Sequence, residues 1–279
     1  IVKSGDITYD FLIQNGNTLL QMKVNDKPLF KALPRLNFWR APTDNDLGSR
    51  PNYSYHLWDG AGHNLAYTFV QHREIGGKHI FEYEVKPRGI EAKINLIYTV
   101  NEDGSLTIDT HYKALSDDMP EMMRFGMIMT LPEEYDQFEW YGRGPGENYI
   151  DRNADTFMGI WEGKVSEQVF EYYRPQETGN KTDVRWLSLT NHKGRKIKVS
   201  GLQALSVSAT NFTPEDLDAG LTKKQQHWSD VIPRKETVLC VDLFQRGIAG
   251  LNSWSEHPLE QYRFRNKEYR YGFIIEVEN

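Results

Sequence analysis

Residues 140–152 read Trp-Tyr-Gly-Arg-Gly-Pro-Gly-Glu-Asn-Tyr-Ile-Asp-Arg and lie at the middle of a chain of 279 residues. Glycine occupies positions 142, 144 and 146, and Pro145 separates two of these glycines. Glycine reaches backbone angles that are closed to other residues, and a proline between glycines cannot propagate a helix. The stretch therefore predicts a turn of defined shape, with the rest of the chain arranged around it.

Aromatic and polar side chains are interleaved in this stretch, and two interpretations follow. The aromatic residues are Trp140, Tyr141 and Tyr149, and the polar ones are Arg143, Glu147, Asn148, Asp151 and Arg152. A pyranose offers C–H faces to aromatic rings and hydroxyls to amide, guanidinium and carboxylate groups, so a sugar-binding surface is one interpretation. The other is a strand connection that is packed by its own tyrosines and pinned by salt bridges. Composition alone favours this structural interpretation.

Alternating hydrophobicity recurs on both sides of the turn. Residues 5–13 alternate, end at the hairpin signal of residues 15–17, and return through residues 18–24 to a second turn at Asn25-Asp26. Further strands are expected at residues 80–86, 91–100, 105–112, 125–131, 184–190, 196–200, 204–209, 237–244 and 271–277. So many strands at short spacing predict an all-β antiparallel sandwich.

Helical signals are sparse. One short helix is expected at residues 213–220, where Thr213 is a cap residue, Pro214 suits the first turn and Gly220 ends the helix. No fixed-period repeat and no low-complexity linker divides the sequence. We therefore expect one domain of two large packed sheets over residues 1–279.

Size, charge and cysteine content narrow the functional classes. A chain of this length buries roughly three quarters of its unfolded surface and needs no disulfide. Its single cysteine, Cys240, lies in a strand-like run and is expected to be a packed thiol, not a nucleophile. The net charge is −6 and the basic residues are scattered, which argues against a nucleic-acid partner.

The sequence shows no sign of a membrane partner. No apolar run approaches the length of a membrane span, and the chain begins at Ile1 with neither a methionine nor a signal-peptide pattern. We expect a processed chain or a piece of a larger protein. Its compartment, cytoplasmic or periplasmic, is not specified by these residues.

Motifs for catalysis are weak. Asp44 and Asp46 form an Asp-x-Asp pair that can hold a divalent cation, but such pairs more often cap turns through hydrogen bonds to the backbone. There is no nucleophile elbow, no His-Glu-x-x-His and no phosphate loop. Glycoside hydrolysis with retention needs two carboxyl groups about 5 Å apart, and no sequence pattern marks such a pair. We expect no catalytic residue and no metal ligand in this chain.

Four motifs occur in a characteristic order: residues 38–46, residues 141–149, residues 174–180, and Ser253-Trp254. In this order they resemble the C-terminal domain of the large multi-domain β-galactosidases of glycoside hydrolase family 2. That domain is also the small chain of two-subunit β-galactosidases, and the resemblance covers essentially the whole sequence. It implies a large antiparallel supersandwich of the galactose-mutarotase-like kind, in an enzyme that hydrolyses terminal β-D-galactosides such as lactose.

The resemblance also implies which part of the enzyme carries the catalytic residues. In the family the catalytic carboxylates and the magnesium belong to a separate barrel portion or large subunit, so this chain is expected to hold no cofactor and to be inactive alone. From the residues alone, Trp254 is either a surface anchor for a ligand or a plug in the core. In the resemblance it matches the family tryptophan that reaches into the sugar-binding site, which implies that it contacts the β-galactoside. Residues 249–252 depart from the acidic residues usual before that tryptophan. The complete enzyme is expected to be an oligomer.

A free-standing carbohydrate-binding or aldose-epimerase-like module is the alternative. Mutarotase chemistry requires a histidine and a glutamate that face one sugar pocket, and the eight histidines show no such pairing in the sequence. A barrel with a glutamate pair encoded upstream of this chain would support the β-galactosidase interpretation.

Overall fold

The computed structural model describes residues 1–11, 19–49, 55–218, 220, 227–248, 252 and 256–278. A four-stranded sheet has the order β1 (Val2–Ser4), β2 (Ile7–Phe11), β3 (Leu19–Val24) and β4 (Lys27–Pro28). A second, twelve-stranded sheet follows the path β12 (Phe157–Lys164), β11 (Gln137–Gly144), β13 (Lys181–Thr190), β14 (Lys196–Thr210), β16 (Glu268–Glu278), β9 (Leu106–Ala114), β8 (Ala92–Val100), β7 (Lys78–Pro87) and β6 (Leu65–Ile75). Its remaining strands are β5 (Ala32–Asn37), β10 (Arg124–Leu131) and β15 (Thr237–Gln245).

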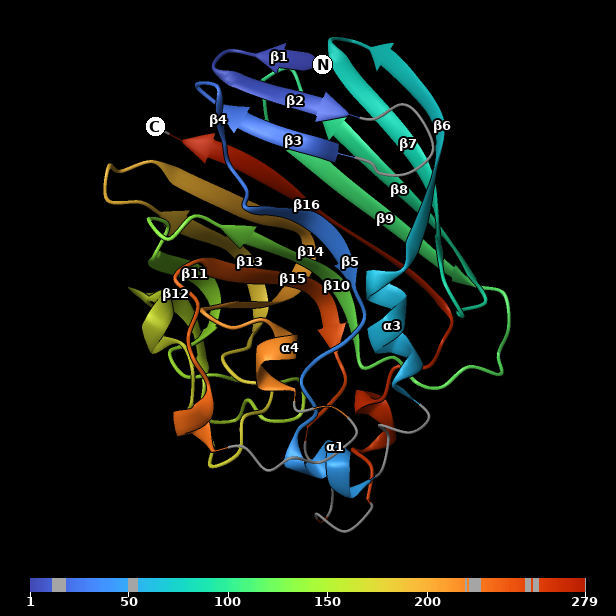
Figure 1. The fold of residues 1–279 in the computed structure, drawn as a ribbon, viewed down its shortest axis with the longest axis vertical. Coiled ribbons are helices and arrows are strands. Elements are labelled where there is room, and N and C mark those ends of the chain that lie inside the picture. Colours follow the sequence, from blue (N-terminus) through green and yellow to red (C-terminus); the bar gives the residue numbers. More distant parts are fainter. Residues whose placement is uncertain are drawn as a thin grey trace.

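The large sheet curls because β14 has three neighbours. Its first half pairs with β13 and β16, and its second half pairs with β13 and with β15, which leads on to β10 and β5. The layer of β5, β10 and β15 then lies across β9 and β16 (Figure 1). Phe125 on β10 contacts Tyr271 on β16 with ring centroids 5.3 Å apart. The expected all-β antiparallel sandwich is confirmed, but most of both layers comes from one curled sheet.

The four-stranded sheet completes the core at the end of the molecule that carries both chain termini (Figure 1). Tyr9 and Met22 are fully buried. Phe11 stacks on Phe81 of β7 with centroids 4.0 Å apart, and the Tyr9 hydroxyl donates to the Gly104 carbonyl at 2.6 Å. Both residues of the Asn25-Asp26 turn are in the left-handed region, at φ 50° and 61°, which confirms that hairpin. The other expected turn, at residues 15–17, lies outside the described residues.

The described helices are short: α1 (Asp44–Gly48), α3 (Leu57–His63), α4 (Pro214–Leu217), and the 3₁₀ turns η1 (Val165–Glu167), η2 (Trp228–Asp230) and η3 (Glu260–Tyr262). Thr213 caps α4 and Pro214 is its first residue, so the helix expected at residues 213–220 is confirmed but ends earlier, at Leu217. Among the residues that the structure describes, no helix has the length and apolar character that crossing a membrane requires.

Several elements differ from the expectation. The strands expected at residues 196–200 and 204–209 are one strand, β14. Strands β5, β6 and β12 carried no recognised signal; β6 and β12 lack a strongly buried face, so their hydrophobicity does not alternate clearly. Sequence patterns detect strands through a buried face, and edge strands such as these weaken that signal.

The turn expected from residue 140 onward begins later. Residues 140–144 belong to β11, which is paired with β12 on one side and with β13 on the other. None of Gly142, Gly144 and Gly146 has a positive φ. A Cβ atom at Gly142 would lie 2.7 Å from Val184 Cγ2, and one at Gly144 would lie 2.6 Å from Trp161 Cδ1. These two glycines therefore admit neighbouring side chains, and the turn starts at Pro145.

Candidate functional site

Three of the four sequence motifs meet at the end of the sandwich that carries α1 (Figure 1). The Glu177 N–H donates to the Ala41 carbonyl at 3.2 Å, which joins the third motif to the first. Gln176 bonds both to the backbone N–H of Asp44 (3.1 Å) and to its carboxylate (3.0 Å). The fourth motif, Ser253-Trp254, lies outside the described residues, so the predicted sugar contact of Trp254 stays a prediction.

The second and third motifs are joined through the side chain of Glu147, and the side chain of Asn148 binds the strand that follows the third motif. Glu147 Oε2 accepts hydrogen bonds from the Gly179 N–H (2.7 Å) and the Thr178 hydroxyl (2.9 Å). Asn148 Oδ1 accepts from the N–H and the hydroxyl of Thr182, at 2.8 and 2.6 Å. These polar groups therefore hold the loops together.

The aromatic residues of the glycine-rich stretch at residues 140–152 are mostly buried. Trp140 and Tyr149 are each 1% exposed, whereas Tyr141 is 38% exposed. Buried rings present no face to a sugar. For Trp140, Tyr149, Glu147 and Asn148 the structural interpretation is confirmed.

Arg124 is the centre of a buried ion cluster beneath the third motif. Its guanidinium lies 2.7 Å from Glu177 Oε1 and 3.0 Å from Asp242 Oδ2, and all three side chains are almost inaccessible. Burial raises the pKa of Asp242 to about 7, and the nearby Arg124 only partly opposes this shift. Burial likewise raises the pKa of Cys240 to about 12. Cys240 is therefore a packed, protonated thiol, as expected.

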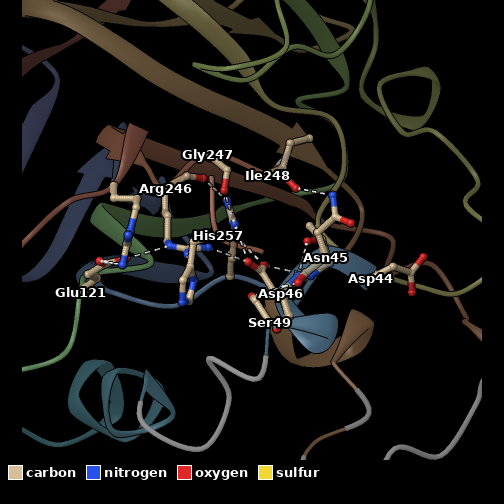
Figure 2. Close-up of polar contacts among 12 residues, drawn as sticks. Asp44, Asn45, Asp46, Ser49, Glu121, Arg246, Gly247, Ile248 and His257 are labelled. Carbon is tan, nitrogen blue, oxygen red and sulfur yellow. Dashed lines mark hydrogen bonds and ion pairs between the residues drawn. The ribbon is translucent and has the colours of Figure 1, made fainter. Parts of the chain in front are cut away.

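A second buried cluster is built on α1 (Figure 2). Thr43 and Asp46 form a capping box, in which Asp46 Oδ2 accepts from the Thr43 N–H at 3.0 Å. Arg40 binds the same carboxylate with two nitrogens, at 3.1 and 3.0 Å, and Arg246 Nη1 lies 3.3 Å from Oδ1. Bidentate arginine–carboxylate pairs are strong and fixed in geometry.

The carboxylate of Asp46 is thus occupied by cationic and backbone donors. The turn-capping interpretation of Asp44 and Asp46 is confirmed through Asp46, while Asp44 is exposed and bonded to Gln176. Within the described ranges, no group of three or more His, Cys, Asp or Glu side chains is arranged to hold a metal ion.

Arg246 extends this cluster across the end of the sandwich. Its Nε donates to Glu121 Oε2 at 3.2 Å, and its Nη2 lies 2.9 Å from His257 Nδ1 (Figure 2). Because a guanidinium only donates, Nδ1 of His257 accepts and the proton of the neutral ring lies on Nε2. Burial and the adjacent Arg246 lower the pKa of His257, which favours that neutral form.

The backbone of residues 246–248, directly after β15, is held at each of its N–H and C=O groups. The N–H groups of Arg246 and Gly247 donate to the carbonyls of Met123 and Tyr262, both at 2.9 Å. Arg40 donates to the carbonyls of Arg246 and Gly247.

Ile248 completes this set of bonds. Its N–H donates to Asp151 Oδ1 at 3.1 Å, and its carbonyl accepts from Asn45 Nδ2 at 2.8 Å. We call residues 246–248 with their partners Arg40, Asn45 and Asp151 the Ile248 clamp. The sequence predicts the strand at residues 237–244 that leads into these residues, but their partners come from distant segments and leave no local signal.

Fold and site together define a class: an antiparallel β-sandwich domain whose end loops are fixed by buried arginine–carboxylate pairs. Comparison with known proteins makes the assignment specific. Residues 3–275 match the family described as the beta galactosidase small chain, and the chain belongs to this family.

Three relatives named beta-galactosidase illustrate the relationship. The protein of Priestia megaterium is 34% identical over 242 residues, which cover 86% of this chain and 23% of that protein. The protein of Halalkalibacterium halodurans is 28% identical over 253 residues, with 88% and 24% covered. The protein of Lactobacillus delbrueckii subsp. bulgaricus is 29% identical over 245 residues, with 86% and 23% covered. The matched region is thus about a quarter of the length of these relatives.

Proposed function

We propose that this chain is the C-terminal, small-chain portion of a β-galactosidase of the glycoside hydrolase family 2 type, which hydrolyses terminal β-D-galactosides such as lactose. The observation that carries the proposal is the family match over residues 3–275, together with relatives named beta-galactosidase that are about four times as long as the matched region. A barrel portion or large subunit of the same enzyme would supply the catalytic carboxylates and the magnesium. The complete enzyme would be an oligomer.

The chemistry of the site supports this division of work. A retaining glycosidase needs an acid and a nucleophile about 5 Å apart that face the substrate. The buried carboxyl groups of Asp46, Glu177 and Asp242 instead lie against arginines. These carboxylates contribute structure, and in the proposed enzyme the contribution of this chain to the sugar site would be Trp254.

Two assays test the proposal. The purified chain should match buffer when it is given a chromogenic β-galactoside. In the complete enzyme, Trp254→Leu should weaken substrate binding by about tenfold, because one aromatic contact is worth roughly 0.5–1.5 kcal/mol and 1.4 kcal/mol is one decade. Turnover by the chain alone that disappears when its own carboxylates are mutated would refute the proposal. A Trp254→Leu enzyme with unchanged kinetics would refute the role of Trp254.

A further inference from the structure

The β6–β7 hairpin carries two histidines that the proposed function does not use. His72 lies on β6 and His79 on β7, close to the turn that joins these strands, at the end of the molecule where both chain termini lie (Figure 1). His72 is opposite Phe81, and His79 is opposite Glu74. Because the side chains of directly opposed residues share a face of the sheet, both imidazoles lie on the face that carries the buried ring of Phe81.

The orientation of the two imidazoles is set by ring packing and by a contact between their nitrogens. The His72 ring is stacked on Phe81 with centroids 4.3 Å apart, and Phe81 is itself stacked on Phe11 of β2 at 4.0 Å. The imidazole planes of His72 and His79 are inclined by only 6°, and His72 Nε2 lies 3.3 Å from His79 Nδ1. Two nitrogens on paired strands are therefore held side by side, which is the support that a metal site needs.

The facing nitrogens are chemically suited to one metal ion. As they stand, one of them donates an N–H to the other, but a neutral imidazole has two tautomers, so the donor ring can carry its proton on the far nitrogen. Both facing nitrogens then offer a lone pair, the form in which imidazole binds Zn²⁺ or Cu²⁺. Two nitrogens bound tetrahedrally to Zn²⁺ at about 2.0–2.1 Å lie about 3.3–3.4 Å apart. This separation matches the 3.3 Å between His72 Nε2 and His79 Nδ1, so a tilt of the rings suffices to direct both lone pairs at one ion.

The charges around the pair favour a cation. Glu74 Oε2 lies 3.9 Å from His79 Nδ1, and a nearby carboxylate lowers the energy of a positive ion. Arg73 lies between His72 and Glu74 in sequence, so its side chain points to the opposite face of β6. There its guanidinium is paired with Glu82, away from the imidazoles.

We propose that His72 and His79 form a binding site for a divalent transition-metal ion of the Zn²⁺ or Cu²⁺ kind, with water completing the coordination. The bound ion ties β6, the last strand on the path of the large sheet, to its neighbour β7. Both ligating nitrogens belong to this chain, so the site goes beyond the proposed function and does not depend on it. It also departs from the expectation of no metal ligand, because no ligand motif in the sequence relates the two histidines across the hairpin turn.

The chain offers matched variants. His72→Phe keeps a ring to stack on Phe81 and removes the ligating nitrogen, and His79→Phe removes the nitrogen that faces it. His111→Phe is the control. His111 also lies on a strand, its side chain is 28% exposed against 29% for His79, and it bonds to Glu268 at 2.6 Å.

The first measurement is a calorimetric titration of the chain, without an affinity tag, with ZnCl₂. The wild type should bind one Zn²⁺ at this site, and an excess of Mg²⁺, which requires oxygen ligands, should not displace it. His72→Phe and His79→Phe should each bind Zn²⁺ about tenfold more weakly or worse, because losing only the outer partner of a ligand costs roughly 10–100-fold. His111→Phe should match the wild type. Unchanged Zn²⁺ affinity in both site variants would overturn the proposal.

The second measurement needs no variant and places the ion in the folded chain. Substoichiometric Cu²⁺ broadens the amide resonances of nearby residues, so the wild type should first lose signals around His72 and His79. No broadening, or broadening centred on His56 and His63, which lie near Asp59, would overturn the proposal. Failure of the β-galactosidase assays would leave both results standing, because neither measurement involves a sugar.

Discussion

Arg40 shows how much of the end of the sandwich depends on one side chain. It is fully buried, binds both oxygens of Asp46, and donates to the carbonyls of residues 246 and 247. Removing one partner of a buried ion pair costs about 3–5 kcal/mol, because the other charge is left buried and unpaired.

Arg40→Ala should therefore lower the melting temperature by several degrees or more. Arg234→Ala is the matched control: Arg234 also binds an aspartate with two nitrogens, but its side chain is 46% exposed. Exposed pairs are worth about 0–1 kcal/mol, so this variant should melt close to the wild type. If Arg40→Ala left stability untouched yet abolished sugar binding in the complete enzyme, the structural role assigned to Arg40 would be wrong.

Asp242 makes the stability of the folded chain depend on pH, and the burial of its carboxyl group determines the sign of this dependence. Its pKa is about 7 in the folded chain, against about 3.9 for an exposed aspartate. Between these two values the unfolded chain releases the proton and the folded chain keeps it. The contribution of Asp242 to stability is therefore present at low pH and is lost as the pH rises toward 7.

Asn imitates the protonated carboxyl, so Asp242→Asn should remove this dependence. The melting temperature of the wild type should fall relative to that of the variant between pH 4.5 and pH 7.5, which paired thermal melts would measure. A wild type that gains stability relative to the variant over this interval would mean that Arg124 keeps Asp242 ionised throughout.

Strand β11 shows where sequence patterns mislead at the scale of an element. Three glycines and a proline within residues 142–146 indicate a turn, but two of the glycines lie in β11 and are paired with β12, just beyond the part of β11 that also pairs with β13. Glycine serves there because Val184 and Trp161 occupy the space of its missing Cβ atom. Such a requirement comes from the neighbouring strand and leaves no mark in the local pattern. By contrast, β8 was predicted nearly to the residue, because its buried and exposed positions alternate.

Gly142→Ala tests this account of β11. The added methyl would lie 2.7 Å from Val184 Cγ2 and 2.9 Å from Val184 Cα, so a rotamer change in Val184 alone does not relieve the contact. Overpacking of this kind costs about 1–3 kcal/mol. Gly146→Ala is the control, since nothing lies within 4 Å of its Cβ position. Urea unfolding should show a clear loss in the free energy of unfolding for Gly142→Ala and little change for Gly146→Ala. Equal losses in the two variants would mean that Gly142, like Gly146, is required by a turn and not by the contact with Val184.

For the whole molecule, the fold class follows from local signals and the site does not. Most long strands with a buried face show an alternating pattern in the sequence, although β11 does not, and enough of them do so to predict an antiparallel sandwich. The Ile248 clamp joins Asn45, Asp151 and Ile248 through folding alone, and no spacing in the sequence relates them. The family motifs mark three of the segments that meet in the fold. Only the folded chain shows which of their atoms form hydrogen bonds with one another.

The extent of the domain over residues 1–279 is itself testable, because one hydrophobic core cluster runs through both sheets. It includes Met22 of the four-stranded sheet and Ile275 of the twelve-stranded sheet. Met22→Ala removes a fully buried side chain and should cost about 2–5 kcal/mol. If the two sheets unfold as one cooperative unit, this loss must appear at every probe of the large sheet.

Tryptophan fluorescence is such a probe, because the first tryptophan in the sequence is Trp39 and the four-stranded sheet ends at Pro28. In Met22→Ala the urea midpoints from fluorescence and from far-ultraviolet circular dichroism should fall together. Lys3→Ala, at an exposed position of β1, is the control and should leave both midpoints near those of the wild type. A fluorescence midpoint that stays in place while the circular dichroism transition splits would show that the four-stranded sheet unfolds independently, and the single-domain prediction would be wrong.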